Sequence, residues 1–347
     1  MNRKIRIALI GLLFLILALG LAGCSGGTDS VDTNDGSHHE MLQTHFVTFH
    51  YGEGDSYTVP VFHGEKVDYM DAPDIGAKIF QGWYVDASYR YRYDFSKPVV
   101  TNIELYAKYS VDYAAITNTI TTETMHGIVK VNVEQYKPKK FWGITIGKDR
   151  DSRKASQGSG VVFYLSDSFA LILTNCHVAH QYSGYSYYES TVTDCKGNTF
   201  EASLYRNVNK SETAIDADYD LAVLYVNLEG KAHEFIQIDM AGQDPIEGAV
   251  TVSVGTPDGQ QNALAFGTVT GYGQITLSET SPEESNVTFD VLHHNAFTQP
   301  GSSGGAILDE SCSLIGIHYA GSMNDDYHGY AIPIEKVREF LDHYVYN

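Results

Sequence analysis

Hydrophobic and polar residues alternate along most of this chain, which is the pattern of short β-strands with one buried face. The alternation is regular from Phe46 to Tyr51 and returns in short segments bounded by Gly and Pro. Helical spacing of apolar residues is limited to short runs, one of which follows Pro333 and comprises Ile334, Val337, Phe340, Leu341 and Tyr344. The pattern predicts an all-β protein with one short C-terminal helix packed on its last domain.

The first residues have the features of an export signal. Residues 3–6 contain three basic side chains, and the apolar run Ile7–Leu21 is shorter than the ~20 residues that a membrane-spanning helix needs. The run ends in Leu21-Ala22-Gly23-Cys24, which resembles a bacterial lipobox. This resemblance implies cleavage after residue 23, acylation of Cys24 and a lipid anchor on the extracytoplasmic face of the cell membrane. An ordinary signal peptide is the alternative, and the polar residues 24–44 predict a flexible stalk.

Residues 45–110 predict a small β module. A Val-x-Phe opening at Val47, a Gly-Trp-Tyr centre at Gly82, a Tyr-Asp-Phe at Tyr93 and a terminal Leu-Tyr-Ala-Lys-Tyr at Leu105 follow one another. Together they resemble the internalin-type B repeat, a surface module without chemistry of its own. A passive spacer is favoured, since aromatic residues in so small a module usually form its core. A binding module with an exposed aromatic face is the alternative.

Composition narrows the possible partners. The chain has 23 Lys and Arg against 43 Asp and Glu, a formal net charge of −20. This charge repels nucleic acid and anionic lipid headgroups, and no basic stripe is expected to offset it, so nucleic acid is excluded as a partner. Besides Cys24, only Cys176, Cys195 and Cys312 are present, so at most one intrachain disulfide is possible. No Cys-x-x-Cys pair occurs, and neither a metal nor a cofactor is expected.

Three polar residues stand at the ends of predicted strands, in an order that suggests nucleophilic catalysis. His177 follows the strand Ala170–Leu173, Asp220 precedes Leu221–Tyr225, and Ser303 lies in the glycine-rich segment Gly301–Gly305. A serine hydroxyl needs a base to attack a peptide bond, and a carboxylate can orient a histidine for that task. Flanking glycines let backbone N–H groups point toward the developing oxyanion.

Longer motifs around these residues resemble the trypsin-like peptidases of the HtrA type. The matching segments, spread over residues 121–347, are Ile172–Val178, Asp220–Leu224, Gly301–Gly305 and Gly329–Pro333. The resemblance implies a two-barrel chymotrypsin-like fold acting on proteins or peptides. It also implies His177 as base, Asp220 as orienting acid, Ser303 as nucleophile, and an oxyanion hole from the N–H groups of Gly301 and Ser303. Asp216 and Asp218 are second choices for the acid.

Two positions depart from that family. Ser302 stands where the family usually has Asn or Asp, and Asn295 stands where it has Asp. These departures keep open a catalytically silent homologue that serves as a surface binding protein. A quality-control HtrA-like protease is a further alternative. The chain ends soon after the predicted helix, without the peptide-binding PDZ domain usual in that type, which favours a simpler peptidase. Cys176 is expected to pack in the core.

Substrate preference is predicted from three further positions. Phe297 stands six residues before Ser303, at the base of the S1 pocket in trypsin-like enzymes, which disfavours cleavage after Lys or Arg. Thr298 and His318 stand where staphylococcal glutamyl endopeptidases bind the carboxylate of the substrate. The resemblance implies a preference for Glu or Asp at P1, because a hydroxyl and an imidazole can donate hydrogen bonds to a carboxylate. Small or apolar P1 residues are the alternative.

Overall fold

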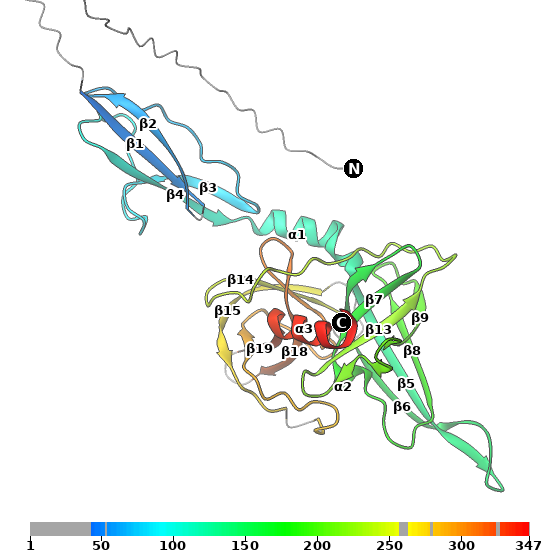
Figure 1. Cartoon of the computed structure of the whole chain (residues 1–347). Coiled ribbons are helices and arrows are strands. Elements are labelled where there is room, and N and C mark those ends of the chain that lie inside the picture. The colour runs from blue at the N-terminus through cyan, green and yellow to red at the C-terminus, as the bar shows by residue number, and fades with distance from the viewer. Residues whose placement is uncertain (1–42, 53, 257–262, 278–279, 324–326, 347) are drawn as a thin grey trace, which may run out of the picture. The chain divides into compact units, whose positions relative to one another are not determined.

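The computed structural model describes residues 43–52, 54–256, 263–277, 280–323 and 327–346 (Figure 1). The predicted signal peptide, Cys24 and nearly all of the predicted stalk lie outside these residues. In the described part of the chain, no helix is both long and apolar enough to cross a membrane.

The first described unit of secondary structure is a four-stranded sheet. Its strands are β1 (Thr44–Tyr51), β2 (Asp55–Phe62), β3 (Lys78–Tyr84) and β4 (Ile103–Val111), in the order β2-β1-β4-β3. Trp83 is almost fully buried, and Phe49 packs edge-to-face on it with ring centroids 4.7 Å apart. The central aromatic residues of the repeat therefore form its core, as the spacer interpretation expects.

A helix follows this sheet, although no helical pattern was evident there in the sequence. Helix α1 (Tyr113–Thr122) begins after Asp112, whose side chain accepts a hydrogen bond from the N–H of Ala115. Its Ile116 and Ile120 are buried on one face and belong to the same apolar cluster as the strands that follow. A short 3-10 turn, Thr124–Gly127, leads into those strands.

The next strands form a sheet that closes on itself. They are β5 (Ile128–Phe141), β6 (Ile144–Leu165), β7 (Phe169–Thr174), β8 (Tyr187–Thr193), β9 (Thr199–Leu204), β12 (Ile215–Asp216) and β13 (Leu221–Asn227). The order is β12-β13-β7-β6-β5-β8-β9, and a further pairing of β13 with β9 joins six of these strands into a ring. Two-residue strands β10 (Arg206–Asn207) and β11 (Glu212–Thr213) pair with each other beside it.

A second ring is a closed barrel of six strands. It consists of β14 (Val250–Gly255), β15 (Ala263–Gly273), β16 (Val291–His294), β17 (Ala306–Leu308), β18 (Leu314–Met323) and β19 (Tyr327–Pro333). Helix α3 (Ile334–Leu341) follows, with Ile334, Val337, Phe340 and Leu341 buried, and a π-turn at Asp342–Tyr346 ends the described chain. The predicted all-β fold of two barrels with a C-terminal helix is therefore confirmed.

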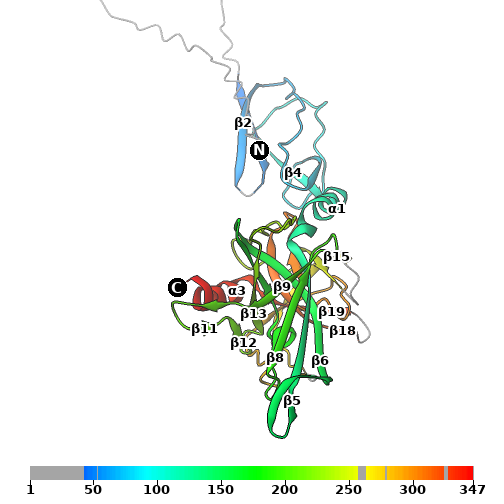
Figure 2. The same cartoon turned by 90° about the vertical axis from the view of Figure 1, so that its right-hand side faces the viewer.

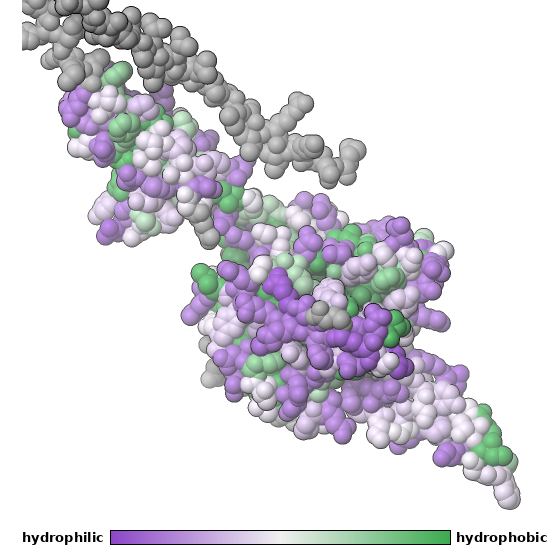
Figure 3. All heavy atoms as spheres, viewed as in Figure 1, coloured by the Kyte–Doolittle hydropathy of each residue, from purple (hydrophilic) through white to green (hydrophobic). Residues whose placement is uncertain are grey.

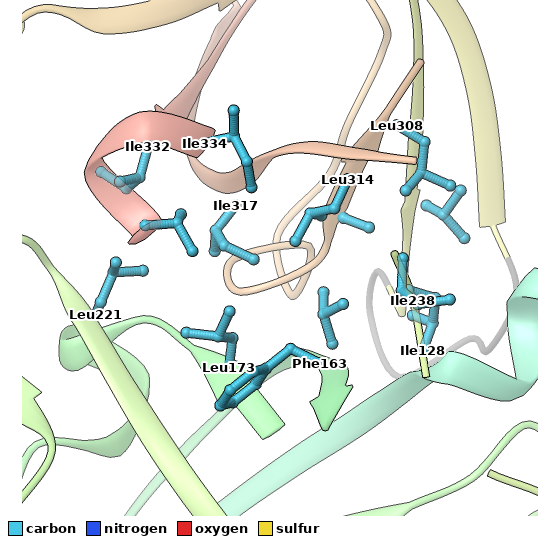
Figure 4. Close-up of a cluster of buried hydrophobic side chains, with 14 of the residues drawn as sticks. Ile128, Phe163, Leu173, Leu221, Ile238, Leu308, Leu314, Ile317, Ile332 and Ile334 are labelled. Carbon is cyan, nitrogen blue, oxygen red and sulfur yellow. The ribbon is translucent and has the colours of Figure 1, made fainter. Parts of the chain in front are cut away.

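The two barrels share one apolar cluster. Leu173 and Leu221 of the first barrel face Ile317 and Ile332 of the second, and all four side chains are fully buried (Figure 4). Because removal of this surface from water is favourable in proportion to its area, the cluster holds the two barrels together.

Candidate active site

His177 and Asp220 are brought together by the pairing of two strands. Ala222 of β13 pairs with Thr174 of β7, so the residues just beyond these ends lie side by side. His177 lies in the short helix α2 (Cys176–Ala179), and its Nδ1 is 2.7 Å from Oδ2 of Asp220. The backbone N–H of His177 donates to Oδ1 of the same carboxylate at 2.9 Å. With Nδ1 as the donor, Nε2 is left as the basic nitrogen of the ring.

The carboxylate changes the basicity of the imidazole. Burial disfavours the charged form of His177, but the charge and hydrogen bond of Asp220 outweigh this effect and raise the pKa of the ring above its ordinary value. Asp220 is fully buried, and this burial raises the pKa of its carboxyl against the lowering effect of the bonds from His177. The arrangement favours an imidazole that accepts a proton and holds it.

The backbone of Asp220 is itself unusual. Its φ of +48° lies in the left-handed region, which Asp tolerates better than most residues. The N–H of Asp220 donates to the carbonyl of Ala217 at 3.1 Å, and Nδ2 of Asn175 donates to the backbone carbonyl of Asp220 at 2.9 Å. These bonds hold a conformation that aims the carboxylate at His177. The second choices for the acid have other partners, since Asp216 accepts from Tyr344 and Asp218 accepts from Asn286.

Ser303 lies in the segment Gln299–Gly305, called here the nucleophile loop, where it is the second residue of the second of two successive tight turns. Ser302 N–H donates to the Gln299 carbonyl, and Gly305 N–H donates to the Ser302 carbonyl. The third residue of each turn is a glycine with positive φ, +94° at Gly301 and +82° at Gly304, as a type II turn requires. The N–H groups of Gly301 and Ser303 donate to no other residue in the described part of the chain. They remain available for an incoming oxyanion.

Ser159 of β6 connects the nucleophile loop to the first barrel. Its N–H donates to the Ser303 carbonyl at 2.7 Å, and its hydroxyl donates to the Gly301 carbonyl at 2.9 Å. The same hydroxyl accepts from the N–H of Thr256 at 2.9 Å. The small neighbours of Ser159 were expected to let another backbone come close, and a Cβ at Gly158 would lie 2.7 Å from the Ser303 carbonyl oxygen.

His177 and Ser303 line a cleft of about 900 Å³, together with all three residues predicted for substrate preference. Phe297 is half exposed at 45%, whereas Thr298 and His318 are buried. Oγ1 of Thr298 lies 3.1 Å from Nε2 of His318, so the two side chains form one polar group at the cleft wall.

His318 has a second histidine beside it that sequence reasoning did not connect with the cleft. The ring of His294 is fully buried, and its centroid lies 5.9 Å from that of His318. Gly329 makes room for this ring, because a Cβ there would lie 2.2 Å from Cε1 of His294. Burial lowers the pKa of His294 to about 4, and burial followed by the two neighbouring histidines lowers the pKa of His318 well below its ordinary value. Both rings are therefore neutral at pH 7.

The remaining predicted positions have structural partners. Asn295 accepts a hydrogen bond from the N–H of Thr268 at 2.7 Å and lies outside the nucleophile loop. Ser302 is buried, and its hydroxyl faces the N–H of Gln299. Cys176 is buried as expected, and it is free, as are Cys195 and Cys312.

Comparison with known proteins agrees with this geometry. Residues 158–317 match the model of the trypsin-like peptidase domain, and residues 45–108 match the Listeria-Bacteroides repeat domain. The second match confirms the repeat identified from the sequence, and the first supports a serine endopeptidase domain.

Curated relatives are proteases of the HtrA type. "Protease Do-like 1, chloroplastic" of Arabidopsis thaliana is 29% identical over 56% of this chain, and "Serine protease Do-like HtrA" of Bacillus subtilis is 25% identical over 61%. These matches span only 41% and 44% of the relatives' own lengths. Among solved structures, the active form of the Rv3671c protease of M. tuberculosis has a TM-score of 0.50 at 20% identity, covering 68% of this chain and 88% of that one, which shows a shared fold.

Removal of the Ser159 hydroxyl should lower both the stability of the protein and the activity of the site, and the two effects can be measured separately. Ser159→Ala leaves the Thr256 N–H and the Gly301 carbonyl without their partner, which should lower the free energy of unfolding by about 1–3 kcal/mol. The nucleophile loop then loses one of its two bonds to the first barrel, so Ser303 should be slightly misplaced relative to His177. Such a misplacement of a reacting group should lower kcat/KM on a peptide substrate tenfold or more. Denaturant unfolding and peptide hydrolysis measure the two effects.

Ser190→Ala is the matched control. Ser190 is also buried in the first barrel, but its hydroxyl donates to the Ala202 carbonyl, far along the chain from the nucleophile loop. This variant should lose stability without a specific loss of activity. Equal kcat/KM in the two variants would show that Ser159 contributes only to stability.

Proposed function

We propose that this chain is an extracytoplasmic serine endopeptidase that hydrolyses peptide bonds in proteins or peptides. The observation that carries the proposal is the hydrogen-bonded pair of Asp220 and His177 in one cleft with Ser303, beside two backbone N–H groups that have no partner among the described residues. In a trypsin-like domain, each of these parts has a step to perform.

The reaction follows from the positions of these groups. Nε2 of His177 takes the proton of the Ser303 hydroxyl while Oγ attacks the substrate carbonyl carbon. The N–H groups of Gly301 and Ser303 donate to the resulting oxyanion. Protonated His177, stabilised by Asp220, gives its proton to the leaving amine, and an acyl-enzyme remains. Water then attacks the acyl carbon by the same route in reverse, with His177 again as base.

Two adjacent serines provide the decisive test. Ser303→Ala should abolish peptide hydrolysis and labelling by a fluorophosphonate, because loss of a triad member typically costs ~10⁴–10⁶ in kcat. Ser302→Ala is the matched control, since the Ser302 side chain is buried at only 4% exposure, and it should retain labelling. Circular dichroism would verify that both variants are folded. Absence of labelling in the unaltered protein would favour the silent homologue.

For specificity we propose an acidic residue at P1. Support comes from the Thr298–His318 pair in the cleft wall and from the position of Phe297, where a basic P1 residue would need an opposite charge. Since burial keeps His318 neutral in the free protein, a substrate carboxylate is expected to raise the pKa of His318 and draw a proton onto it. A small or apolar P1 residue would leave this ring neutral.

The pH dependence of selectivity tests this proposal. Protonation of His177 affects the cleavage of two peptides equally if they differ only in Glu or Gln at P1. The ratio of their kcat/KM values therefore reports only the interaction of the P1 side chain with its pocket. A carboxylate-bound His318 has a raised pKa, so the preference for Glu should be greatest where the P1 carboxyl is ionised and His318 is still protonated. It should fall as pH rises through the raised pKa, and also as pH falls through the pKa of the P1 carboxyl. His318→Asn should reduce the preference by about 10–100-fold, as for loss of a hydrogen bond to a charged group.

His293→Gln is the control, because the ring of His293 packs on Tyr330, on the face of β16 opposite to His294. It should leave the ratio unchanged. Faster cleavage after Leu than after Glu, at a pH where the P1 carboxyl is ionised, would contradict an acidic preference and support the apolar alternative.

Location rests on the sequence alone. We propose that residues 1–23 direct export and that Cys24 carries the lipid anchor, with the repeat module as a spacer. Failure of a fatty-acid probe to label Cys24 would instead support an ordinary signal peptide. The HtrA-type relatives are compatible with a quality-control role, which remains the alternative physiological task.

A further inference from the structure

The hairpin of β5 and β6 projects from its domain and ends in exposed apolar side chains. Figures 1 and 2 show the distal part of these two strands extending past the rest of the sheet. At its end, Phe141 is 63% exposed, Trp142 89%, Ile144 69% and Ile146 58%. The same end is apolar in the space-filling view (Figure 3). Four large apolar residues so close together and so exposed indicate a contact surface rather than scattered surface residues.

The turn at the tip uses an unfavourable residue. Trp142 and Gly143 have φ of +50° and +77°, and Phe141 pairs with Ile144 across them, which is the geometry of a type I′ hairpin turn. Asn or Gly is preferred at the position of Trp142, because a large side chain is disfavoured at positive φ. Trp142 therefore does not serve the turn itself, and its ring extends into solvent instead of packing in a core.

The hairpin carries a net positive charge, in contrast to the acidic chain as a whole. Residues 137–154 contain seven of the 23 basic residues of the chain and only two of its 43 acidic residues. Lys139, Lys140 and Arg150 are exposed and make no ion pair with any residue that the structure describes. The sequence-based expectation that no basic segment offsets the acidic composition is thus wrong for this hairpin. Its charges also project away from the acidic body, whose field is screened beyond about 10 Å at moderate salt.

We propose that this hairpin docks on an anionic lipid bilayer. Trp142 and Phe141 would enter the headgroup region, where amphipathic aromatic rings are favoured, and Ile144 and Ile146 would follow them. Lys139 and Lys140, just behind the tip, would contact lipid phosphates. This contact is separate from the proposed peptidase activity and from the proposed lipid anchor, and it would hold the catalytic domain at the membrane surface.

The chain contains its own reporter for this contact. It has two tryptophans, of which Trp83 is 1% exposed and Trp142 is 89% exposed. When the full-length protein is mixed with phosphatidylglycerol-rich vesicles, Trp142 emission should shift to shorter wavelength and be quenched by brominated lipid. Vesicles of phosphatidylcholine alone should cause little change, and added salt should reverse the effect. Attachment through the N-terminus is common to all variants and cancels in the comparison.

Variants separate the apolar and the charged contributions. Ile144→Thr combined with Ile146→Thr removes two exposed apolar side chains and keeps Trp142 as the reporter, so it should weaken the spectral shift while peptide hydrolysis is retained. Lys139→Gln combined with Lys140→Gln should weaken the vesicle response of Trp142 about fivefold per charge removed. The control pair Lys66→Gln with Lys231→Gln removes two exposed lysines elsewhere and should have no effect.

Three outcomes would overturn the proposal. The first is Trp142 emission that does not respond to anionic vesicles, and the second is an equal response to zwitterionic vesicles. The third is a spectral shift that grows with protein concentration in the absence of lipid, which would assign the hairpin to contact with a second copy of the chain.

Discussion

The alignment of the site depends on the contact between the two barrels at Ser159. His177 and Asp220 are fixed to the first barrel by strands β7 and β13, whereas Ser303 belongs to the second. Each half is rigid within its own barrel, so the position of the hydroxyl relative to the imidazole is set where the barrels meet. Ser159 meets this need with two bonds to the nucleophile loop and one from Thr256. A nonpolar residue there would keep the backbone bond to Ser303 but would lose the hydroxyl bonds to Gly301 and Thr256.

This polar contact works together with the apolar cluster that the barrels share. The cluster supplies cohesion without direction, because burial of apolar surface depends on area and not on angle. Hydrogen bonds depend on angle, and unpaired buried groups are costly, so the bonds of Ser159 select one arrangement among those that the cluster would allow. Gly158 and Gly304 make this arrangement possible, since a side chain at either would meet backbone of the opposite barrel or the Ser159 carbonyl.

Sequence reasoning succeeded where the signal was local. Alternation identified the strands, and contiguous motifs placed His177, Asp220 and Ser303 at strand ends that the structure brings to one cleft. It missed features that depend on distant pairing. Ser159 and Gly301 are 142 residues apart, and His294 lies near His318 because their strands, β16 and β18, both pair with β19. Helix α1 escaped notice because six of its ten residues are Ile or Thr, which have low helix propensity. The net charge of the whole chain did not reveal the basic hairpin, because a sum over all residues hides a short segment of opposite charge.

Local differences in charge would also explain how an acidic protein could accommodate the acidic ligands proposed at two places. In the cleft, His318 is neutral when free and can take up a proton when a carboxylate arrives, so the pocket need not carry a permanent charge that the surrounding acids would neutralise. On the hairpin, cations are held on strands that extend beyond the acidic surface, and screening limits repulsion from the body. Both proposed contacts would act at distances shorter than the reach of the screened field of the acidic surface.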